Sequence, residues 1–190
     1  MTRGILDTSM YVPAHRLQLA DVGDALRRNG SRGSRSVAAY DEDATTMAVA
    51  AASGIDASVT PGRLLLASTN PAYLDKSNAA TVHAALGLHE HVLAADAGGS
   101  VRSVVAALLL ALDGQATTMV VGADVIAGRP GSVDESEGGD GAAAVLVGEA
   151  TPERPLLAEL VGHESTTIEL LDRWRNPGDD TSSVWEDRFG

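Results

Sequence analysis

The sequence predicts an α/β fold with a mixed, mostly parallel sheet and a buried central helix. Apolar runs of strand length alternate with helical patterns along the chain, as they do in βαβ units. The chain has 190 residues, of which 44% are hydrophobic, enough for one sizeable domain. Only 3% are aromatic, so Ala, Val and Leu must fill the core and bring the layers close together.

The first elements are expected before residue 37. A strand is expected over 4–12, which Pro13 ends. Apolar residues recurring at spacings of three and four predict a short amphipathic helix over 18–28. A flexible stretch of Ser, Gly and Arg follows over 31–36.

The middle of the chain predicts two helices around a buried strand. A helix is expected over 44–53, with Asp43 as its N-cap and Gly54 as its stop. The unbroken apolar run 63–67 is typical of a strand that is buried on both faces of a parallel sheet. The next helix is expected over 78–86.

The alternation continues toward the carboxyl end. The expected elements are a strand at 91–97, a helix at 101–112, strands at 117–123, 141–148 and 156–162, and an acidic, glycine-rich loop at 128–140. The helix 101–112 has almost no polar face, which predicts burial on all sides between two sheets. One domain is expected over 1–165, followed by a polar tail over 166–190. Three aromatic anchors of the tail are expected to dock on a partner: Trp174, Trp185 and Phe189.

Charge and cysteine content exclude several classes of function. The formal charge is −12, and Lys76 is the only lysine, so nucleic acid and anionic membranes are disfavoured as partners. The absence of cysteine excludes disulfides, thiolate metal sites and a Cys nucleophile. No apolar run approaches the ~20 residues of a spanning helix, and no signal-peptide layout opens the chain, so a cytoplasmic location is expected.

Four segments carry a family resemblance. They are an acidic helix start at 41–48, a strand and loop ending in Asp-Lys-Ser at 66–77, a glycine turn leading into a helix at 95–103, and a glycine-rich loop and strand at 138–148. In this order and spacing they resemble the amino-terminal half of thiolase-superfamily enzymes, closest to 3-hydroxy-3-methylglutaryl-CoA synthase and next to ketoacyl synthase III. The resemblance implies that 1–165 is a thiolase-like amino-terminal half of a layered α/β/α fold, in which two similar halves pair.

The resemblance also implies a chemistry. In those enzymes a thiolate at the amino end of the buried helix attacks an acyl thioester, and a carbon nucleophile then condenses with the bound acyl group. The family cysteine position is occupied here by Val101, and Asn70 stands near the segment where the synthases carry a glutamate acid/base. The implied substrate is a CoA or carrier-protein thioester. No cofactor and no metal are expected.

Ser100 is a weak candidate nucleophile, because its hydroxyl needs an adjacent base, and a helix N-cap is the favoured interpretation. Tyr73, Asp75 and Lys76 lie on a loop that resembles the one near the substrate channel and dimer interface of the synthases. An interface role is favoured over substrate binding, and Lys76 is expected to pair with a neighbouring carboxylate. Arg102 opposes the helix dipole, so it should meet Asp96, an acid of a partner or an anionic ligand.

Other polar residues have simpler interpretations. Gly139 and Gly141 are expected to allow close backbone approach near a pocket floor. The acidic loop before them is interpreted as a solvated turn. His89 and His91 are expected to point to opposite faces of a strand rather than to bind metal, and His83 is expected to be partly buried with its hydrogen bonds satisfied.

These observations predict a half-enzyme of an acyl-thioester condensing complex that forms or cleaves carbon–carbon bonds. The expected partner is a thiolase-fold chain that supplies the carboxyl-terminal half or the catalytic Cys and His, or a second copy of this chain. The resemblance also implies a small OB-fold and zinc-ribbon protein as a further partner. Two alternatives stay open: a non-catalytic scaffold for an active homologue, and a Cys-independent acyl transfer or retro-aldol reaction.

Overall fold

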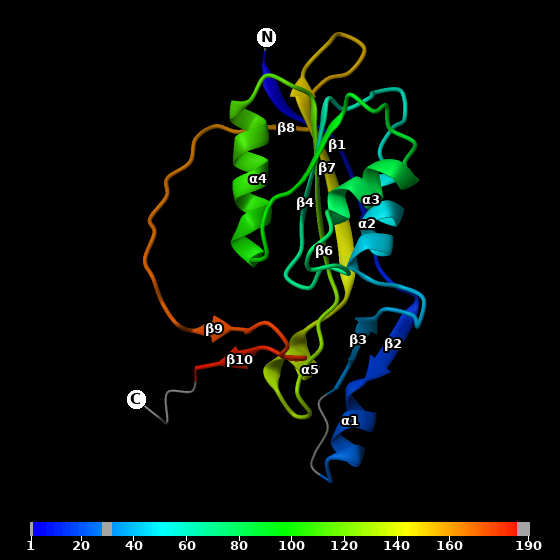
Figure 1. Ribbon diagram of the computed structural model, residues 1–190, viewed down its shortest axis with the longest axis vertical. Helices are drawn as coiled ribbons and strands as arrows, with labels where there is room; N and C mark the ends of the chain where they lie inside the picture. The colour runs from blue at the N-terminus through cyan, green and yellow to red at the C-terminus, as the bar shows by residue number, and fades with distance from the viewer. Residues whose placement is uncertain (1, 28–31, 186–190) are drawn as a thin grey trace. The chain divides into compact units, whose positions relative to one another are not determined.

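The computed structural model describes residues 2–27 and 32–185, which Figure 1 shows as a ribbon. The chain divides into two compact units. The first unit comprises 1–15, 36–125 and 140–161, and the second comprises 16–35, 126–139 and 162–190. Within the described residues, no helix is long and apolar enough to cross a membrane.

A six-stranded mixed sheet forms the centre of the first unit, in the order β5-β4-β6-β7-β1-β8. Its strands are β1 (Arg3–Tyr11), β4 (Arg63–Ala67), β5 (Leu93–Asp96), β6 (Thr118–Asp124), β7 (Gly141–Glu149) and β8 (Ala158–Glu159). The neighbours β5, β4 and β6 are parallel, whereas β7 runs antiparallel to both β6 and β1. Leu66 pairs with Asp96 on one side and Val121 on the other, so the parallel strands end together at one sheet edge.

The strands match the sequence prediction in place but not always in length. The expected strand 63–67 is confirmed residue for residue. The strand expected over 91–97 begins only at Leu93, because the residues before it form a turn. The strand expected over 156–162 is reduced to two residues that pair with Gly4 and Ile5 of β1.

Helices cover the two faces of this sheet unequally (Figure 1). Helices α2 (Ala44–Ala52) and α3 (Asn78–Ala85) pack together on one face, and α4 (Val101–Asp113) lies on the other. The predicted N-cap of α2 is confirmed, since the Asp43 carboxylate accepts a hydrogen bond from the Thr46 amide at 2.7 Å. The return bond from the Asp43 amide to the Thr46 hydroxyl completes a capping box.

The α2/α3 face carries the larger part of the core. Its fully buried side chains include Met47 of α2, Val82 of α3 and Leu64, Val121 and Leu146 of the sheet. The small alanines of α2 let the helix lie close to the strands, as the low aromatic content predicts. The α4 face has a smaller core, and its buried members are Ala107, Ala111, Val120 and Val147.

Helix α4 is buried on one side only, which differs from the expectation of burial on all sides. Val101, Val105 and Leu110 are 72%, 53% and 67% exposed. A helix is a cylinder, and the one sheet of this unit contacts only one side of it. On the same sheet face, Met10 of β1 is also 77% exposed, opposite the exposed Ala143 of β7.

The remaining elements are short and lie wholly or partly in the second unit. They are β2 (His15–Gln18), α1 (Leu19–Ala25), β3 (Ser34–Val37), α5 (Val133–Glu137), β9 (Arg173–Trp174) and β10 (Ser183–Val184). The expected flexible stretch is therefore wrong for residues 34–36, which pair with β2. Both strands are short and largely polar, so they lack the apolar alternation that reveals a strand. The loop 128–140 also contains α5, whose first turn is capped by Ser132.

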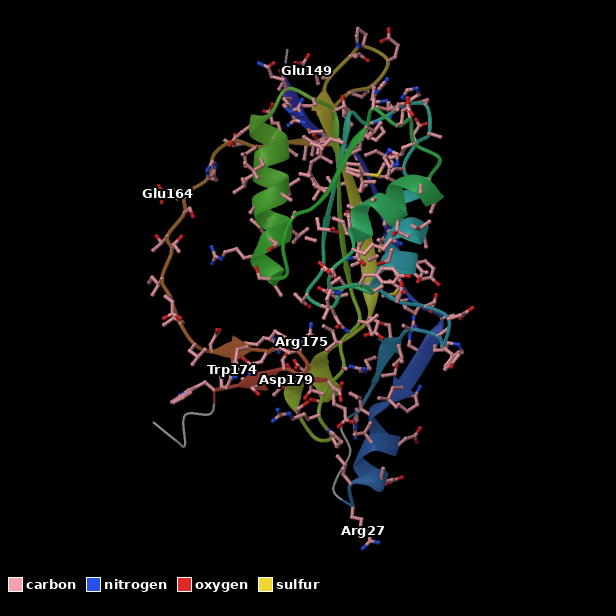
Figure 2. The ribbon with its side chains drawn as sticks, viewed as in Figure 1. Arg27, Glu149, Glu164, Trp174, Arg175 and Asp179 are labelled. Atoms are coloured by element: carbon pink, nitrogen blue, oxygen red, sulfur yellow. The ribbon has the colours of Figure 1, made fainter. Side chains whose placement is uncertain are left out.

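The tail docks within the second unit through arginines. Arg173 forms a two-pronged ion pair with Asp134, at 2.7 and 2.9 Å, and Arg129 donates to the hydroxyls of Thr181 and Ser183. Figure 2 shows Trp174 on this hairpin, where it is half-buried, while Trp185 is half exposed. Phe189, the third expected anchor, lies outside the described residues, and the boundary between 165 and 166 stays a prediction.

Candidate functional site

The predicted site residues gather where the parallel strands end. Polar residues follow or close each strand: Ser68 after β4, Asp96 in β5 and Asp124 in β6. The carboxyl ends of parallel strands are the usual place for ligands in α/β folds. A cavity of about 130 Å³ opens here, between the loop that carries Tyr73 and Lys76 and the turn before α4.

The amino end of α4 forms one wall of this site. Ser100 is the N-cap, as predicted, and its amide donates to the Ser103 hydroxyl at 3.2 Å while the two hydroxyls lie 3.0 Å apart. Gly98 has a φ of +111°, a conformation that favours glycine. The chain therefore turns sharply into α4 and leaves the exposed Val101 as the first residue of the helix.

Asp96 is engaged by α3 and not by Arg102. Its carboxylate accepts hydrogen bonds from the amides of Asn78 and Ala79, at 3.1 and 3.0 Å, and so caps the amino end of α3. This removes one of the three partners expected for Arg102. The Arg102 side chain is exposed and has no hydrogen bond or ion pair to any residue that the structure describes.

Asn78 holds the adjoining loop, a role that sequence reasoning missed. The residue is 4% exposed, and its side-chain oxygen accepts from the Tyr73 amide at 3.0 Å and the Thr45 hydroxyl at 3.2 Å. Its amide group donates to the carbonyls of Tyr73 and Lys76. Four hydrogen bonds from one buried side chain therefore fix the loop against α2 and α3.

The loop presents an aromatic ring and a cation to solvent. The Lys76 ammonium lies 4.6 Å from the centre of the Tyr73 ring, a cation–π contact. This differs from the expected carboxylate partner: in the described part of the chain, Lys76 forms no ion pair. Leu74 and Asp75 beside them are exposed. Three exposed side chains and a cation at the site are compatible with the interface role predicted for this loop.

Asn70 is tied into the same edge of the sheet. Its side-chain amide donates to the Val125 carbonyl at 3.0 Å. Next to it, the Asp124 carboxylate accepts from the Thr69 amide at 2.6 Å and the Ser68 hydroxyl at 3.2 Å. Asp124 was not singled out from the sequence, although an acidic residue at the end of an apolar strand is a detectable pattern. The carboxylate fixes the start of the loop.

The glycine-rich segment before β7 is more buried than a solvated turn would be. Asp140 is almost fully buried, and its carboxylate accepts from the Ala38 amide at 2.7 Å. The interpretation of the acidic loop as solvated is therefore wrong for this residue. A side chain at Gly141 would approach the Tyr11 carbonyl at 3.2 Å, so the close approach there is to strand β1. The close backbone approach expected at Gly139 stays a prediction.

A tyrosine hydroxyl and a carboxylate form a hydrogen-bonded pair at the acidic start of α2. The Tyr11 hydroxyl donates to the Glu42 carboxylate, which also accepts from the Ala39 amide at 2.6 Å. The Ala39 amide first, and the Tyr11 hydroxyl second, lower the pKa of Glu42. The same hydrogen bond raises the pKa of Tyr11.

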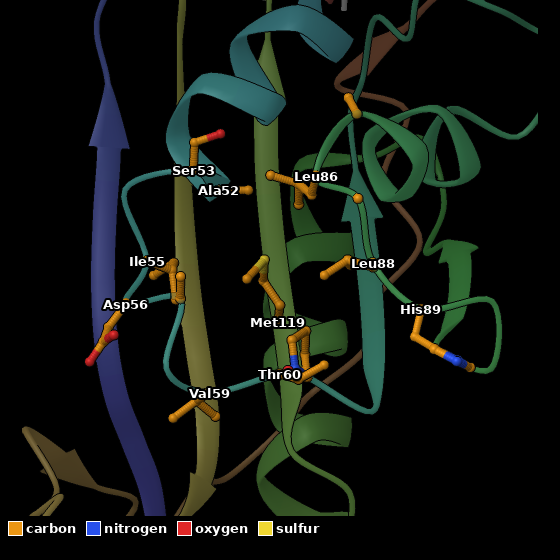
Figure 3. A pocket seen from close by; sticks show the side chains of 14 residues that line it. Ala52, Ser53, Ile55, Asp56, Val59, Thr60, Leu86, Leu88, His89 and Met119 are labelled. Atoms are coloured by element: carbon orange, nitrogen blue, oxygen red, sulfur yellow. The ribbon is translucent and has the colours of Figure 1, made fainter.

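A second, larger cavity lies at the opposite edge of the sheet. It holds about 540 Å³ between the segments that follow α2 and α3. Figure 3 shows apolar side chains of Ile55, Leu86 and Met119 lining it, with Asp56 and His89 on opposite sides. The Ser58 amide first, then the Ser58 hydroxyl and Arg154, bind the Asp56 carboxylate and lower its pKa. The groups at its rim thus serve the fold.

The histidines form a small cluster rather than pointing apart. His89 and His91 lie in the turn before β5, not in a strand, and their ring centres are 4.8 Å apart. The expectation of opposite faces is therefore wrong. His83 is half-buried, with its Nε2 atom 3.0 Å from the His89 carbonyl, as expected for a satisfied side chain. Within the described ranges, no group of three His, Cys, Asp or Glu side chains is placed to hold a metal.

No model of a protein family matches the chain. The hydroxymethylglutaryl-CoA synthase of Methanopyrus kandleri is 29% identical over 192 residues, which cover 92% of this chain and 54% of the relative. The same enzyme of Methanosarcina barkeri is 31% identical over 196 residues, covering 94% and 55%. The chain thus spans about half the length of the curated relatives that it matches.

Solved structures agree with the curated relatives. An HMG-CoA synthase crystallised with CoA superposes with a TM-score of 0.82 at 23% identity, over 97% of this chain and 50% of the other. The chain has a thiolase-like fold. A 3-oxoacyl-(acyl carrier protein) synthase III of Pseudomonas aeruginosa shares the thiolase-like fold with a TM-score of 0.61 at 25% identity, over 80% and 53%. The matching part is the amino-terminal half of the synthases, as the resemblance implied.

Proposed function

We propose that this chain is a thiolase-like half of an assembly that acts on acyl thioesters in carbon–carbon bond formation or cleavage, like HMG-CoA synthase or ketoacyl synthase III. In this proposal the chain contributes the framework of the site, and another thiolase-like half contributes the reacting thiol and the groups that activate it. The substrate is a thioester of CoA or of a carrier protein.

The observation that carries the proposal is the amino end of α4. A sharp glycine turn exposes the first helical residue beside a cavity, where a helix dipole stabilises a thiolate. That residue is Val101, whose side chain has no atom that can attack a thioester. The site has the shape of a nucleophile turn, and its own chain provides no thiol.

Ser100 does not replace the missing thiol in this proposal. A hydroxyl nucleophile needs a general base within hydrogen-bond reach. The Ser100 hydroxyl is bonded to the Ser103 hydroxyl, which is not a base at neutral pH. A Cys-independent acyl transfer or retro-aldol reaction would need a base from a partner.

The uncovered apolar face supports the need for another half. Exposed apolar side chains on α4 and on the neighbouring strands lie on one face: Met10, Val101, Val105, Leu110 and Ala143. Covering such a surface stabilises an assembly by about 25 cal/mol per Å², and large exposed apolar patches mark interaction sites. A small OB-fold and zinc-ribbon protein is part of the proposal as a further partner.

A scaffold without catalysis is the second candidate. Asn70, which stands near the segment where the synthases carry an acid/base glutamate, donates its amide to a backbone carbonyl and cannot exchange a proton at neutral pH. Together with Val101, this leaves two chemical positions of the family without reactive groups. In this second proposal, the chain stabilises an active homologue.

Cysteine substitution at the helix start tests the proposal. Val101→Cys should gain a thiol with a lowered pKa, measured as faster alkylation near neutral pH. Val105→Cys, one turn along the same exposed face, is the matched control and should react as an ordinary thiol. The Val101→Cys chain, incubated with labelled acetyl-CoA, should be acylated only when a thiolase-like half that carries the catalytic His is co-expressed.

The outcomes separate the candidates. Acylation of Val101→Cys with the partner supports the half-enzyme, whereas a stable complex without acylation favours the scaffold. Acylation of the unmodified chain that Ser100→Ala abolishes would establish the Cys-independent reaction instead. A chain that binds no thiolase-like half overturns both proposals.

A further inference from the structure

We infer that the exposed face of α4 binds α4 of a second copy of this chain, side by side and antiparallel, so that two copies form a symmetric pair. The inference rests on the proposed function in one respect, that a thiolase-fold surface covers this face. It concerns the chain that no Cys-bearing half has joined, since a second copy also lacks cysteine. The evidence is the arrangement of apolar and charged residues on α4 itself.

The exposed residues of α4 form one continuous face. At 100° per residue, Val101, Val105, Ala106 and Leu110 fall within one half of the helix circumference, and all are exposed. The buried residues Ala107 and Ala111 fall in the opposite half, against the sheet. Arg102, Leu109 and Asp113 lie along the middle line of the exposed half, with the two charges at its ends.

Both charges stand at the unfavourable end of their own helix. Arg102 lies in the first turn, where the helix dipole is positive, and Asp113 ends the last turn, where it is negative. Both side chains are exposed, and in the described residues neither has a hydrogen bond or an ion pair. In a single copy, each charge is therefore slightly destabilising and unpaired.

Antiparallel pairing with a second copy reverses both effects. Arg102 of one copy comes opposite Asp113 of the other, at the negative end of the other helix, and the twofold axis repeats the contact. With this register, the small Ala106 of one copy lies opposite Leu109 of the other near the middle line. Val105 and Leu110 lie at the same height on the two flanks of the contact. A partner helix of unrelated sequence has no reason to match this pattern, whereas a second copy matches it by symmetry.

The neighbouring sheet surface adds contact area. A helix of 13 residues is about 20 Å long. One face of such a helix buries less surface than the roughly 800 Å² per partner of a standard interface. Met10 of β1 and Ala143 of β7 extend the apolar surface beside α4. The chain carries a formal charge of −12, but the contact face is balanced, with one Arg and one Asp. Charges more than about 8–10 Å away are screened at physiological salt.

Pairing also bears on the candidate site. Arg102 follows Ser100 and Val101 directly, so the last turn of the second α4 would lie beside the turn at which the site opens. The second copy covers the site without supplying a thiol, because it has no cysteine either, and a Cys-bearing half would have to displace it.

A charge exchange tests the pairing. The oligomeric state of the 190-residue chain is measured by sedimentation at up to about 100 μM, for the unmodified chain, Arg102→Asp, Asp113→Arg and the double variant. The unmodified chain should form dimers. Each single variant sets like charges against each other at both ends and should raise the dissociation constant about tenfold or more, while the double variant should restore it.

Further variants separate misfolding and other partners from the pairing. Leu110→Glu should abolish the dimer, and Tyr40→Glu, a change at an exposed aromatic residue outside α4, should not. Arg102→Asp should raise the midpoint of thermal unfolding of the monomer, because an acid then occupies the first turn of α4. Far-ultraviolet circular dichroism confirms that each variant is folded.

The results distinguish this inference from the proposed function. A chain that stays monomeric, or a double variant that does not recover, overturns the pairing. If such a chain still binds a separate thiolase-like half, the proposed function stands without it. If the pair forms as expected but Val101→Cys is never acylated, the pairing stands and the catalytic proposal fails.

Discussion

The helices on the two faces of the central sheet have similar apolar residues, but those residues are buried to different extents. On one face, α2 and α3 bury Met47, Val82 and Leu64 almost fully. On the other face, α4 buries two alanines and leaves Val101, Val105 and Leu110 in solvent. Apolar content alone therefore does not tell whether a helix is covered by its own chain. The α2/α3 face is a buried core, and the α4 face has the exposed apolar composition of an interface.

The largest expected effect separates the two faces directly. Met47→Ala removes a fully buried side chain and should lower the free energy of unfolding by about 2–5 kcal/mol. Leu110→Ala removes an exposed side chain of α4 and should change it by less than about 0.5 kcal/mol in the monomer. Urea unfolding at low protein concentration measures both. Similar losses from both substitutions would contradict the comparison.

A smaller loss of stability is expected where the α2/α3 face meets the site. Asn78→Ala removes the side chain that bonds Thr45, Tyr73 and Lys76, and should cost about 1–3 kcal/mol because buried partners lose their hydrogen bonds. Amide hydrogen exchange should rise over residues 71–77. The matched control is Ser77→Ala, which removes only the hydroxyl that caps α3. It should leave exchange in residues 71–75 unchanged.

Gly98→Ala should have a more local effect, on the α4 face. The φ of +111° strains any residue with a Cβ, and the added atom would lie 2.9 Å from the Ser103 hydroxyl. A cost of about 1 kcal/mol is expected, together with increased hydrogen exchange in the first turn of α4. Gly99→Ala is the control, because the nearest atom to its Cβ is 3.9 Å away. Equal effects of both substitutions would show that the turn does not depend on Gly98.

The smallest expected effect is a change in the pH dependence of stability, at the start of α2. The Ala39 amide and the Tyr11 hydroxyl lower the pKa of Glu42, so the stabilisation is full above the ordinary pKa of about 4.3 and is lost as the pH falls through the lower folded value. Glu42→Gln should make the acid side of the stability curve shallower, measured by urea unfolding at several pH values. Glu90→Gln, at an exposed residue, should leave it unchanged. An unaltered slope in Glu42→Gln would contradict this assignment.

Much of the first unit could be predicted from local pattern. The strand 63–67 and the helix starts at Ala44 and Val101 follow from apolar runs and from the capping residues Asp43 and Ser100, since these depend on neighbours within a few positions. The short polar strands β2 and β3 escaped prediction, because pairing with each other, and not an apolar pattern, makes them strands.

The sequence predicted several residues of the candidate site but not the contacts that these residues make. Tyr73, Lys76 and Ser100 were recognised from motifs, but the sequence pointed to a carboxylate partner for Lys76 and left Asp96 open as a partner for Arg102. The structure places Lys76 over an aromatic ring and turns Asp96 toward α3. Asn78, which organises the loop, carries no motif that sets it apart.

The sequence by itself determined the order of the main strands and helices of the first unit, the ends of most of those helices and the absence of a cysteine nucleophile, because these depend on residue type and short-range spacing. Only the tertiary structure decided that one face of α4 is exposed, that the sheet turns antiparallel at β7, and which polar groups pair around the site. The physical reason is that burial and hydrogen bonding are relations between distant segments. An apolar helix has the same sequence pattern whether one sheet or two pack against it.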